Sequence, residues 1–288
     1  MGTAKWYLSM CIKQEDNYIT LDQDQYVKNI VSRFEKSFKH EFKTKESPLP
    51  TIFVPSKKDC PIVDTQLKEV KIWFGNLNYR SIIGALPYVS CCTCPDITYA
   101  VNKLAKYVNN PGIAHYRALL HLIGFIKGNS NKGIKFYHDV HKTQLYSVKN
   151  DNNLKVSKGS IITFTDSSWN DCVDTGRSTG GYIQMFQAGA VDYGSHLPVL
   201  VAMSSGEGEY ISAAVACMRA SHIRMLVFDL KFFGTNEYNS NEPNYEPATI
   251  IIDNEVAISM ATCNKDTAGN RHVARRYHYV RLGGAQCG

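Results

Sequence analysis

The stretch "IITFTDSSWNDCVDTGRSTGGYI", residues 161–183, decides the fold of the second half of the chain. Its opening run of β-branched and aromatic side chains predicts a buried strand over 160–165. Asp166 follows the run, and after several small and polar residues a second strand begins at a Gly-Gly pair. An acid in this position is either a plain strand end that leads into a turn or one half of a metal site. The stretch alone leaves both interpretations open.

Composition narrows the class of protein. The chain has 288 residues, of which 44% are hydrophobic and 20% charged, as in ordinary globular proteins. It contains no apolar stretch of about 18 residues and no basic-then-apolar leader, so we predict neither a membrane span nor a signal peptide. Nine irregularly spaced cysteines indicate reduced, intracellular thiols. A net charge of +6 permits binding to a polyanion without requiring it.

Three of the cysteines are close together in sequence, at Cys91, Cys92 and Cys94. They lack a second Cys/His pair at the spacing of a zinc ribbon, and Cys94 leads directly into a proline and a helix. We therefore interpret them as buried free thiols rather than as metal ligands.

The first half of the chain predicts strands, helices and a linker. Two short strands over 4–12 and 18–21 precede an amphipathic helix over 22–38. Its apolar face is Tyr26, Ile30, Val31 and Phe34, and Lys28, Arg33 and Lys36 lie opposite. Residues 41–70 are rich in Pro, Lys, Asp and Thr, which favours a poorly packed loop or linker. After it we expect helices over 95–110 and 113–128, a short strand over 133–139, and a second linker over 148–158.

The order of strand and helix patterns in the second half of the chain favours a mixed sheet. We predict the following elements: strands over 160–165, 180–187, 189–194 (extendable to 202) and 248–252, and helices over 205–233 and 254–262. A helical crossover requires the last strand to lie parallel to a neighbour, most simply to the first strand. Functional groups gather at the carboxyl ends of such parallel strands.

Three acids meet this geometric condition. Asp166 and Asp253 each follow one of the two parallel strands, so both carboxylates should project from one sheet edge. Ser204 and Glu207 form a capping-box pattern at the start of the crossover helix. Glu209, about 200° around that helix from Glu207, should face the sheet. Three converging carboxylates need cations between them, and such oxygen ligands select Mg²⁺ or Mn²⁺.

These motifs resemble the RNase H domain of copia-type LTR retrotransposon Pol polyproteins. "TDSSWND" is similar to the family's "SDADWAG", "DTGRSTGGY" to "D-T-x-x-S-T-S-G-Y", "SSGEGEYISA" to "STTEAEYIA", "DNEVAI" to "DNxSAI" and "RHVARRYHYVR" to "KHIxxxYHxxR". Upstream, "YRSIIGALPYVSCCTCPDITYAVNKLAKYVNNP" is similar to the connection segment. "AKWYLSM" and "LDQDQYVKNIVSRF" resemble the end of the reverse transcriptase palm and its thumb. The resemblance covers nearly the whole chain outside 41–70.

The resemblance implies an α/β fold, an RNase H-like mixed sheet with a crossover helix, preceded by a smaller α+β thumb and connection region. The expected parts are a palm-end and thumb-like region with its linker over 1–70, a connection-like helical hairpin region over 71–150, and an RNase H-like domain over 155–288, truncated at its C-terminus.

The implied activity is hydrolysis of the RNA strand of RNA–DNA hybrids by two-metal catalysis, with two Mg²⁺ or Mn²⁺ ions expected in the intact domain. Asp166 would bridge both ions, and Glu209 and Asp253 would each hold one. The partners would be the hybrid and the remainder of the Pol polyprotein, with no membrane, in a cytoplasmic virus-like particle or in the nucleus. Phosphate contacts would come from a basic stretch, for which a solvated face is the alternative. Its members are Arg271, His272, Arg275, Arg276 and Arg281.

The sequence departs from the family pattern in two respects. The Tyr-x-Asp-Asp motif of polymerase chemistry is absent, so a polymerase centre would lie upstream of residue 1. A fourth acid, expected in an "ADxxTK"-like stretch after one further strand, is also absent, so we expect a fragment cut at both ends. An RNase H module and a catalytically impaired or host-adopted nucleic-acid-binding remnant both remain open.

Two other enzyme classes fit poorly. Asp174, Thr175 and Gly176 spell the triplet of retropepsin-like proteases, but a polar loop precedes them and Arg-Ser follows. An integrase of related fold needs a glutamate well after its second aspartate, whereas Glu255 is only two residues beyond Asp253.

Overall fold

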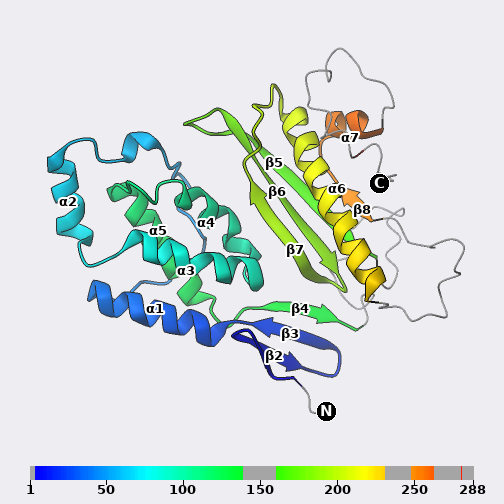
Figure 1. Cartoon of the computed structure of the whole chain (residues 1–288), viewed down its shortest axis with the longest axis horizontal. Coiled ribbons are helices and arrows are strands. Elements are labelled where there is room, and N and C mark those ends of the chain that lie inside the picture. Colours follow the sequence, from blue (N-terminus) through cyan, green and yellow to red (C-terminus); the bar gives the residue numbers. More distant parts are fainter. Residues whose placement is uncertain (1–3, 139–159, 231–247, 263–279, 281–288) are drawn as a thin grey trace, which may run out of the picture. The chain divides into compact units, whose positions relative to one another are not determined.

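The computed structural model describes residues 4–138, 160–230, 248–262 and Val280. These residues form a mixed α/β protein with two four-stranded sheets (Figure 1). The chain divides into two compact units, Met1–Lys135 and Phe136–Gly288, and each is described by itself.

The chain begins with a small sheet of strand order β1-β2-β3-β4, whose last strand runs across the boundary between the two units. Its strands are β1 (Trp6–Tyr7), β2 (Met10–Gln14), β3 (Tyr18–Asp22) and β4 (Ile134–Tyr137). Leu8 and Ser9 adopt left-handed conformations, with φ of 45° and 59°. The strand predicted over 4–12 is therefore two antiparallel strands joined by a tight turn, because local hydrophobicity carries no signal for that turn.

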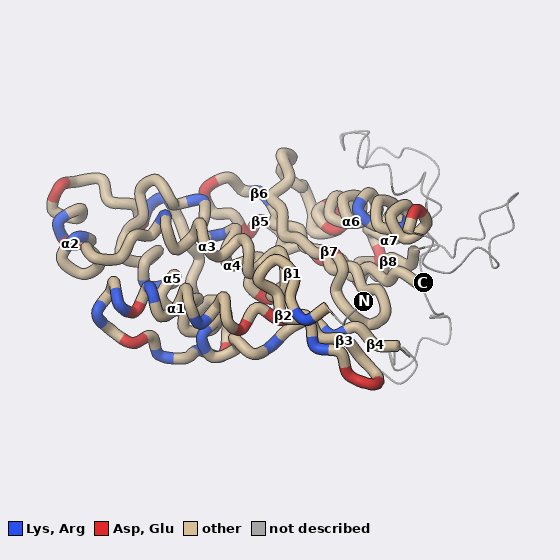
Figure 2. Tube along the Cα trace, turned by 60° about the horizontal axis from the view of Figure 1, so that its bottom comes forward, with Lys and Arg blue, Asp and Glu red and all other residues tan. Residues whose placement is uncertain are grey.

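Five helices follow in the first unit. They are α1 (Asp24–Phe38), α2 (Asp64–Phe74), α3 (Tyr79–Cys92), α4 (Thr98–Ala105) and α5 (Ile113–Gly128), with 3₁₀ turns η1 (Lys57–Asp59) and η2 (Pro95–Ile97). The predicted amphipathic pattern of α1 is confirmed, since Ile30, Val31 and Phe34 are buried and the basic positions opposite are exposed. Figure 2 shows Lys and Arg positions spread along α1 and α2.

A single hydrophobic core joins these helices. It includes Val31 of α1, Phe74 of α2, Ile82 of α3, Leu104 of α4 and Leu119 of α5. Residues on both sides of position 70 contribute to it, so the predicted division there does not coincide with a gap in packing. The assignment of the two parts to thumb and connection stays a prediction.

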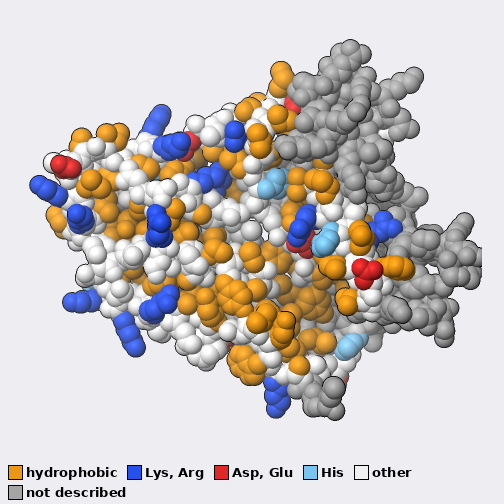
Figure 3. All heavy atoms as spheres, viewed as in Figure 1, with side chains coloured by type: hydrophobic (Ala, Val, Ile, Leu, Met, Phe, Trp, Pro, Cys, Tyr) orange, Lys and Arg blue, Asp and Glu red, His pale blue; other side chains and the backbone are white. Residues whose placement is uncertain are grey.

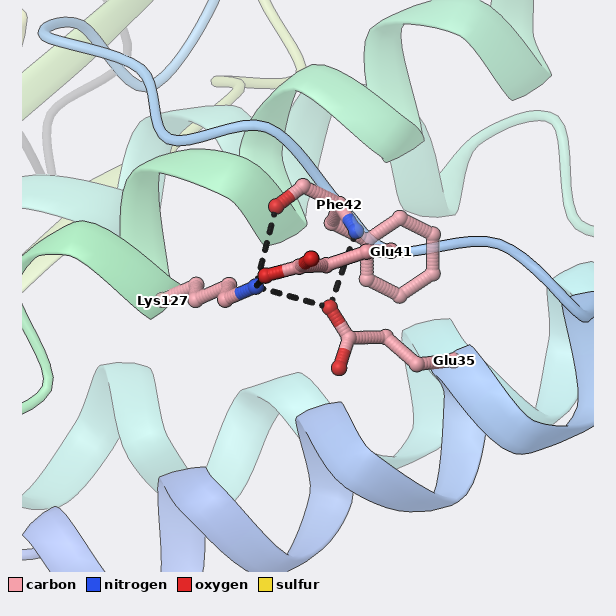
Figure 4. A network of polar contacts seen from close by, with 4 residues as sticks. All are labelled: Glu35, Glu41, Phe42 and Lys127. Atoms are coloured by element: carbon pink, nitrogen blue, oxygen red, sulfur yellow. Dashed lines mark hydrogen bonds and ion pairs between the residues drawn. The ribbon is translucent and has the colours of Figure 1, made fainter.

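Most residues of 41–70 are exposed, as expected of a poorly packed segment, but the segment is anchored at a few points. Phe42 is buried, and a network of polar contacts fixes the backbone beside it (Figure 4). The Nζ of Lys127 lies 3.0 Å from Glu35 Oε1 and 2.6 Å from Glu41 Oε1, and it donates to the Phe42 carbonyl at 3.2 Å. Glu35 Oε1 also accepts the Phe42 N–H at 2.8 Å. The Pro- and Lys-rich composition of the segment gives no sign of these long-range anchors.

The end of this segment also differs from the prediction, because α2 begins at Asp64. Further along the chain, the described cysteines are all free, as expected. Cys91, however, is exposed, and Cys92 and Cys94 are only partly buried, so the expectation of three buried thiols is wrong. Burial raises the pKa of the Cys94 thiol to about 11.

The second unit contains a mixed sheet of order β7-β6-β5-β8. Its elements are β5 (Ile162–Cys172), β6 (Arg177–Phe186), β7 (Gly189–His196), α6 (Ser205–Asp229), β8 (Thr249–Ile251) and α7 (Glu255–Thr262). β5, β6 and β7 are antiparallel neighbours, and β8 is parallel to β5. This is the RNase H-like arrangement predicted from the sequence, with α6 as the crossover helix beside the sheet (Figure 1).

One strand end differs from the prediction. β5 does not end at Asp166 but continues to Cys172, because its pairing with β6 runs on through Asp166 opposite Gly181 and Ser168 opposite Thr179. Only the parallel pairing with β8 stops earlier, at Phe164. Asp166 therefore lies on an extended hairpin rather than in a turn.

Among the described residues, α6 is the one helix long and apolar enough to cross a membrane by length and composition. It lies against β5, β6 and α7. Tyr210, Ile211 and Ala214 are almost completely buried in the core shared with Ile250 and Ala257. The apolar composition of α6 is accounted for by this burial, as in the core helix of a globular protein.

Candidate metal centre

The register of two parallel strands brings the predicted aspartates together. Phe164 of β5 pairs with Ile251 of β8. Asp166 and Asp253 each lie two residues beyond this last pair, so both reach the same edge of the sheet, and side chains two residues apart share a face. The aspartates are thus placed at equivalent positions on neighbouring chains.

The third acid comes from the start of α6. The hydroxyl of Ser204 accepts the N–H of Glu207 at 3.2 Å, which confirms the predicted cap. The carboxylate of Glu207 accepts the N–H of Met203 at 2.9 Å instead of the N–H of Ser204 that a standard capping box uses. Glu207 therefore holds the entry to the helix, and Glu209 is free to face the sheet.

Two glycines allow α6 to begin this close to its neighbours. A Cβ at Gly208 would lie 3.0 Å from the hydroxyl oxygen of Ser167 on β5. A Cβ at Gly206 would lie 2.9 Å from side-chain carbons of Val256 on α7. The absence of side chains at both positions lets the first turn of α6 pack against β5, which carries Asp166, and against α7, which follows Asp253. This close packing brings Glu209 within reach of both aspartates.

The three carboxylates form one cluster. Among the described residues, Asp166, Glu209 and Asp253 each offer an oxygen, and these atoms all lie within 4.8 Å of one another. Glu209 is 5% exposed, whereas both aspartates are exposed. The predicted meeting of these side chains, with Glu207 outside the group, is confirmed. Their roles in catalysis and metal binding stay predictions.

Burial and crowding act on the ionisation of this cluster. Burial raises the pKa of Glu209 to about 7, and the hydrogen bond with Asp166 adds to the rise. The N–H of Ser167 opposes it by donating to Glu209 Oε1 at 3.0 Å. Asp166 Oδ1 accepts the same N–H at 2.6 Å. A divalent cation between these oxygens would offset the repulsion that disfavours three ionised carboxylates.

Sequence reasoning did not find the hydroxyls that hold α6 on the strand. Ser212 lies one turn after Glu209, and its hydroxyl donates to the main-chain carbonyl of Asp166 at 3.1 Å. It is also 2.9 Å from the hydroxyl of Thr165. In the sequence, Ser212 follows Glu209 by three residues, which places both on one helix face. This spacing is the feature of the sequence that indicates Ser212.

The predicted nucleic-acid-binding residues cannot be placed beside this cluster. They lie outside the described residues, as does the linker predicted over 148–158. Those residues are Arg271, His272, Arg275, Arg276 and Arg281.

Sequence comparison finds relatives of this chain among retrotransposon Pol polyproteins. No family model matches the chain. It is 26% identical over 283 residues to the Retrovirus-related Pol polyprotein from transposon TNT 1-94 of Nicotiana tabacum, which covers 98% of this chain and 19% of that protein. It is 26% identical over 276 residues to the Pol polyprotein from transposon RE1 of Arabidopsis thaliana, covering 96% and 16%.

A third relative is shorter. The Uncharacterized mitochondrial protein AtMg00810 of Arabidopsis thaliana is 27% identical over 215 residues, which are 75% of this chain and 76% of that protein. The chain thus spans less than a fifth of the two polyproteins but matches most of a protein of its own size.

The fold and the acidic cluster define a mixed α/β protein of the RNase H-like class. The chain is homologous to retrotransposon Pol polyproteins over most of its length and corresponds to a part of such a polyprotein.

Proposed function

We propose that this chain is an RNase H module that hydrolyses the RNA strand of RNA–DNA hybrids at Asp166, Glu209 and Asp253. The observation that carries the proposal is the convergence of these three carboxylates within 4.8 Å, at one edge of a mixed sheet. The expected partners are the hybrid and the rest of a Pol polyprotein, and the expected place of action is a cytoplasmic particle or the nucleus.

The donor set fits Mg²⁺ or Mn²⁺. Both ions favour oxygen ligands, and Mg²⁺ is bound through one or two carboxylates together with water and substrate phosphate. A pair of such ions about 3.5–4 Å apart stabilises the attacking and leaving oxygens of phosphodiester hydrolysis. Asp166 and Asp253 offer exposed carboxylates on the solvent side, and Glu209 closes the cluster from the helix side.

Each residue has a defined task in this proposal. Glu209, with its raised pKa, needs a neighbouring cation to be fully ionised at neutral pH. The N–H of Ser167 donates to the carboxylates of Asp166 and Glu209, and the hydroxyl of Ser212 donates to the Asp166 carbonyl. These bonds keep Asp166 and the start of α6 in register. Selection of the hybrid rests on groove shape and 2′-OH contacts rather than on base edges. The basic residues from Arg271 to Arg281 are proposed to contact phosphates.

The test is a cleavage assay with the full chain and an RNA–DNA hybrid labelled on its RNA strand. We expect Mg²⁺-dependent cleavage of the RNA strand that Asp166→Asn reduces at least 100-fold, since that change removes a shared ligand. Glu255→Gln is the matched control, because this exposed acid lies two residues from Asp253 but outside the cluster. Equal rates for wild type and Asp166→Asn would rule out the proposal.

A second candidate function is hybrid binding without cleavage. The same samples decide between cleavage and binding alone. If the wild-type chain binds the hybrid but cleaves no RNA, the chain is a nucleic-acid-binding remnant rather than a nuclease.

A further inference from the structure

The hairpin of β5 and β6 extends beyond the carboxylates and is irregular there. The register shifts between Ser168 and Cys172, and Asn170 has a φ of 54°. Asp171 Oδ1 fixes this shape by accepting the N–H of Thr179 at 2.9 Å and its O–H at 2.7 Å. Bulges of this kind turn a side chain away from the direction that a regular strand would give it, and they are common beside active sites.

Trp169 lies within this irregular part of the hairpin. It is 54% exposed, and its indole N–H donates to the carbonyl of Ala202 at 3.2 Å. Val201 and Met203, on either side of Ala202, are also exposed. The polar atom of the indole is thus bound within the protein while much of the ring faces solvent. We call Trp169, Val201 and Met203 the Trp169 surface.

This surface lies close to the acidic cluster. Trp169 follows Asp166 by three residues, so their Cα atoms are at most about 11 Å apart. That distance corresponds to about three base steps of a nucleic acid strand. Figure 3 shows hydrophobic side chains gathered where, in Figure 1, the β5–β6 hairpin and the segment before α6 lie. A strand that places a phosphate at the carboxylates can therefore reach this surface within about three nucleotides.

We propose that Trp169 is a nucleic-acid contact residue, whose ring packs against sugars and bases within a few nucleotides of the phosphate held at Asp166. The inference rests on the proposed function, which puts a nucleic acid at the cluster. An aromatic face binds nucleotides without reading sequence, because every base and sugar offers it an apolar surface. The bond to Ala202 holds the ring in place before the nucleic acid arrives.

Hybrid binding by variants tests this contact. In an Asp166→Asn background, which removes cleavage, we expect Trp169→Ala to weaken binding of a fluorescent RNA–DNA hybrid about 10-fold. Trp169→Phe, which keeps an aromatic ring, should stay within about 3-fold. Trp73→Ala is the matched control, since Trp73 is 64% exposed on α2, and it should bind as the parent does.

A second readout does not depend on the stability of the alanine variant. The chain has three tryptophans, so Trp6→Phe with Trp73→Phe leaves Trp169 as the sole tryptophan. We expect the hybrid to quench its fluorescence at the same concentrations that saturate binding. Unchanged fluorescence, or unchanged affinity of Trp169→Ala, would overturn the inference.

The two proposals fail in distinguishable ways. Cleavage by wild type together with normal binding by Trp169→Ala removes the role of Trp169 and leaves the nuclease standing. If the hybrid quenches Trp169 and Trp169→Ala weakens binding, but no sample cleaves the hybrid, the proposed nuclease activity is ruled out and the contact at Trp169 is supported. Quenching by an unrelated protein but not by the hybrid would contradict the nucleic-acid assignment.

Discussion

At the scale of single residues, glycines determine how closely neighbouring elements approach, because a glycine has no side chain. A Cβ at Gly180 of β6 would lie 2.8 Å from the hydroxyl oxygen of Ser212 and 2.8 Å from a ring carbon of His196. Both distances are shorter than any normal contact, so α6 and β7 can hold these side chains over β6 only because position 180 is glycine. Gly208 has the same role on α6, where it faces Ser167.

The first prediction concerns this close approach. Gly180→Ala should lower the free energy of unfolding by about 1–3 kcal/mol, because Ser212 and His196 must move to admit the methyl group. Gly181→Ala is the matched control in the same strand, since the atom nearest to its added Cβ would be a carbonyl oxygen 3.8 Å away. Urea denaturation of both variants measures the difference. Equal losses at the two positions would contradict the account.

The second prediction concerns His196. Burial lowers the pKa of this side chain from its ordinary value of 6.5, and Tyr182 is the aromatic neighbour, 6.5 Å away between ring centroids. Below pH 6.5 the unfolded chain binds a proton that the folded His196 does not, so stability is lost as the pH falls. His196→Gln should reduce the loss of unfolding free energy between pH 7 and pH 5. An unchanged pH profile for the variant, again from urea denaturation, would refute this.

At the scale of elements, the order and pairing of the strands described in the second unit could be predicted from sequence. Its strands are short apolar runs bounded by turn residues, and the crossover rule fixed β8 beside β5, which placed Asp166, Glu209 and Asp253 at one edge. The extension of β5 could not be predicted, because residues 167–172 carry little hydrophobic signal and their order depends on pairing with β6.

The first unit was harder to predict for a related reason. The segment from Glu41 to Asp64 is rich in proline and lysine, and its position depends on partners far away in sequence. Lys127 reaches it from α5, and Gly124 lets its backbone pass over that helix, since a Cβ there would lie 2.2 Å from the carbonyl oxygen of Lys43. Local periodicity cannot report contacts between residues more than 80 positions apart.

The third prediction tests that anchor. Lys127→Met keeps an apolar stem but removes the contacts to Glu35, Glu41 and the Phe42 carbonyl. The segment should open more often, so trypsin should cut after Lys43 several-fold faster. Limited proteolysis with mass analysis of the fragments measures this rate. Lys36→Met, at an exposed position of α1, is the control, and equal rates in the two variants would show that the network does not hold the segment.

At the scale of the whole molecule, the sequence is similar to retrotransposon Pol polyproteins and the architecture is compatible with an RNase H-like fold. Nearly the full length of the chain matches Pol polyproteins at 26% identity. The net charge of +6 suits a polyanionic partner, but net charge cannot specify the chemistry performed on it. In the proposed function, that chemistry is assigned to three acids from β5, α6 and the segment after β8, which the folded chain brings within 4.8 Å of one another.

The central claim is that Asp166, Glu209 and Asp253 form one divalent-cation site, and calorimetric titration of the full chain with Mn²⁺ at neutral pH tests it most directly. We predict saturable binding that Asp166→Asn and Asp253→Asn each weaken at least 10-fold, because each removes a charged oxygen ligand. Glu255→Gln should leave the affinity unchanged. Equal Mn²⁺ affinity in all four proteins would contradict the account.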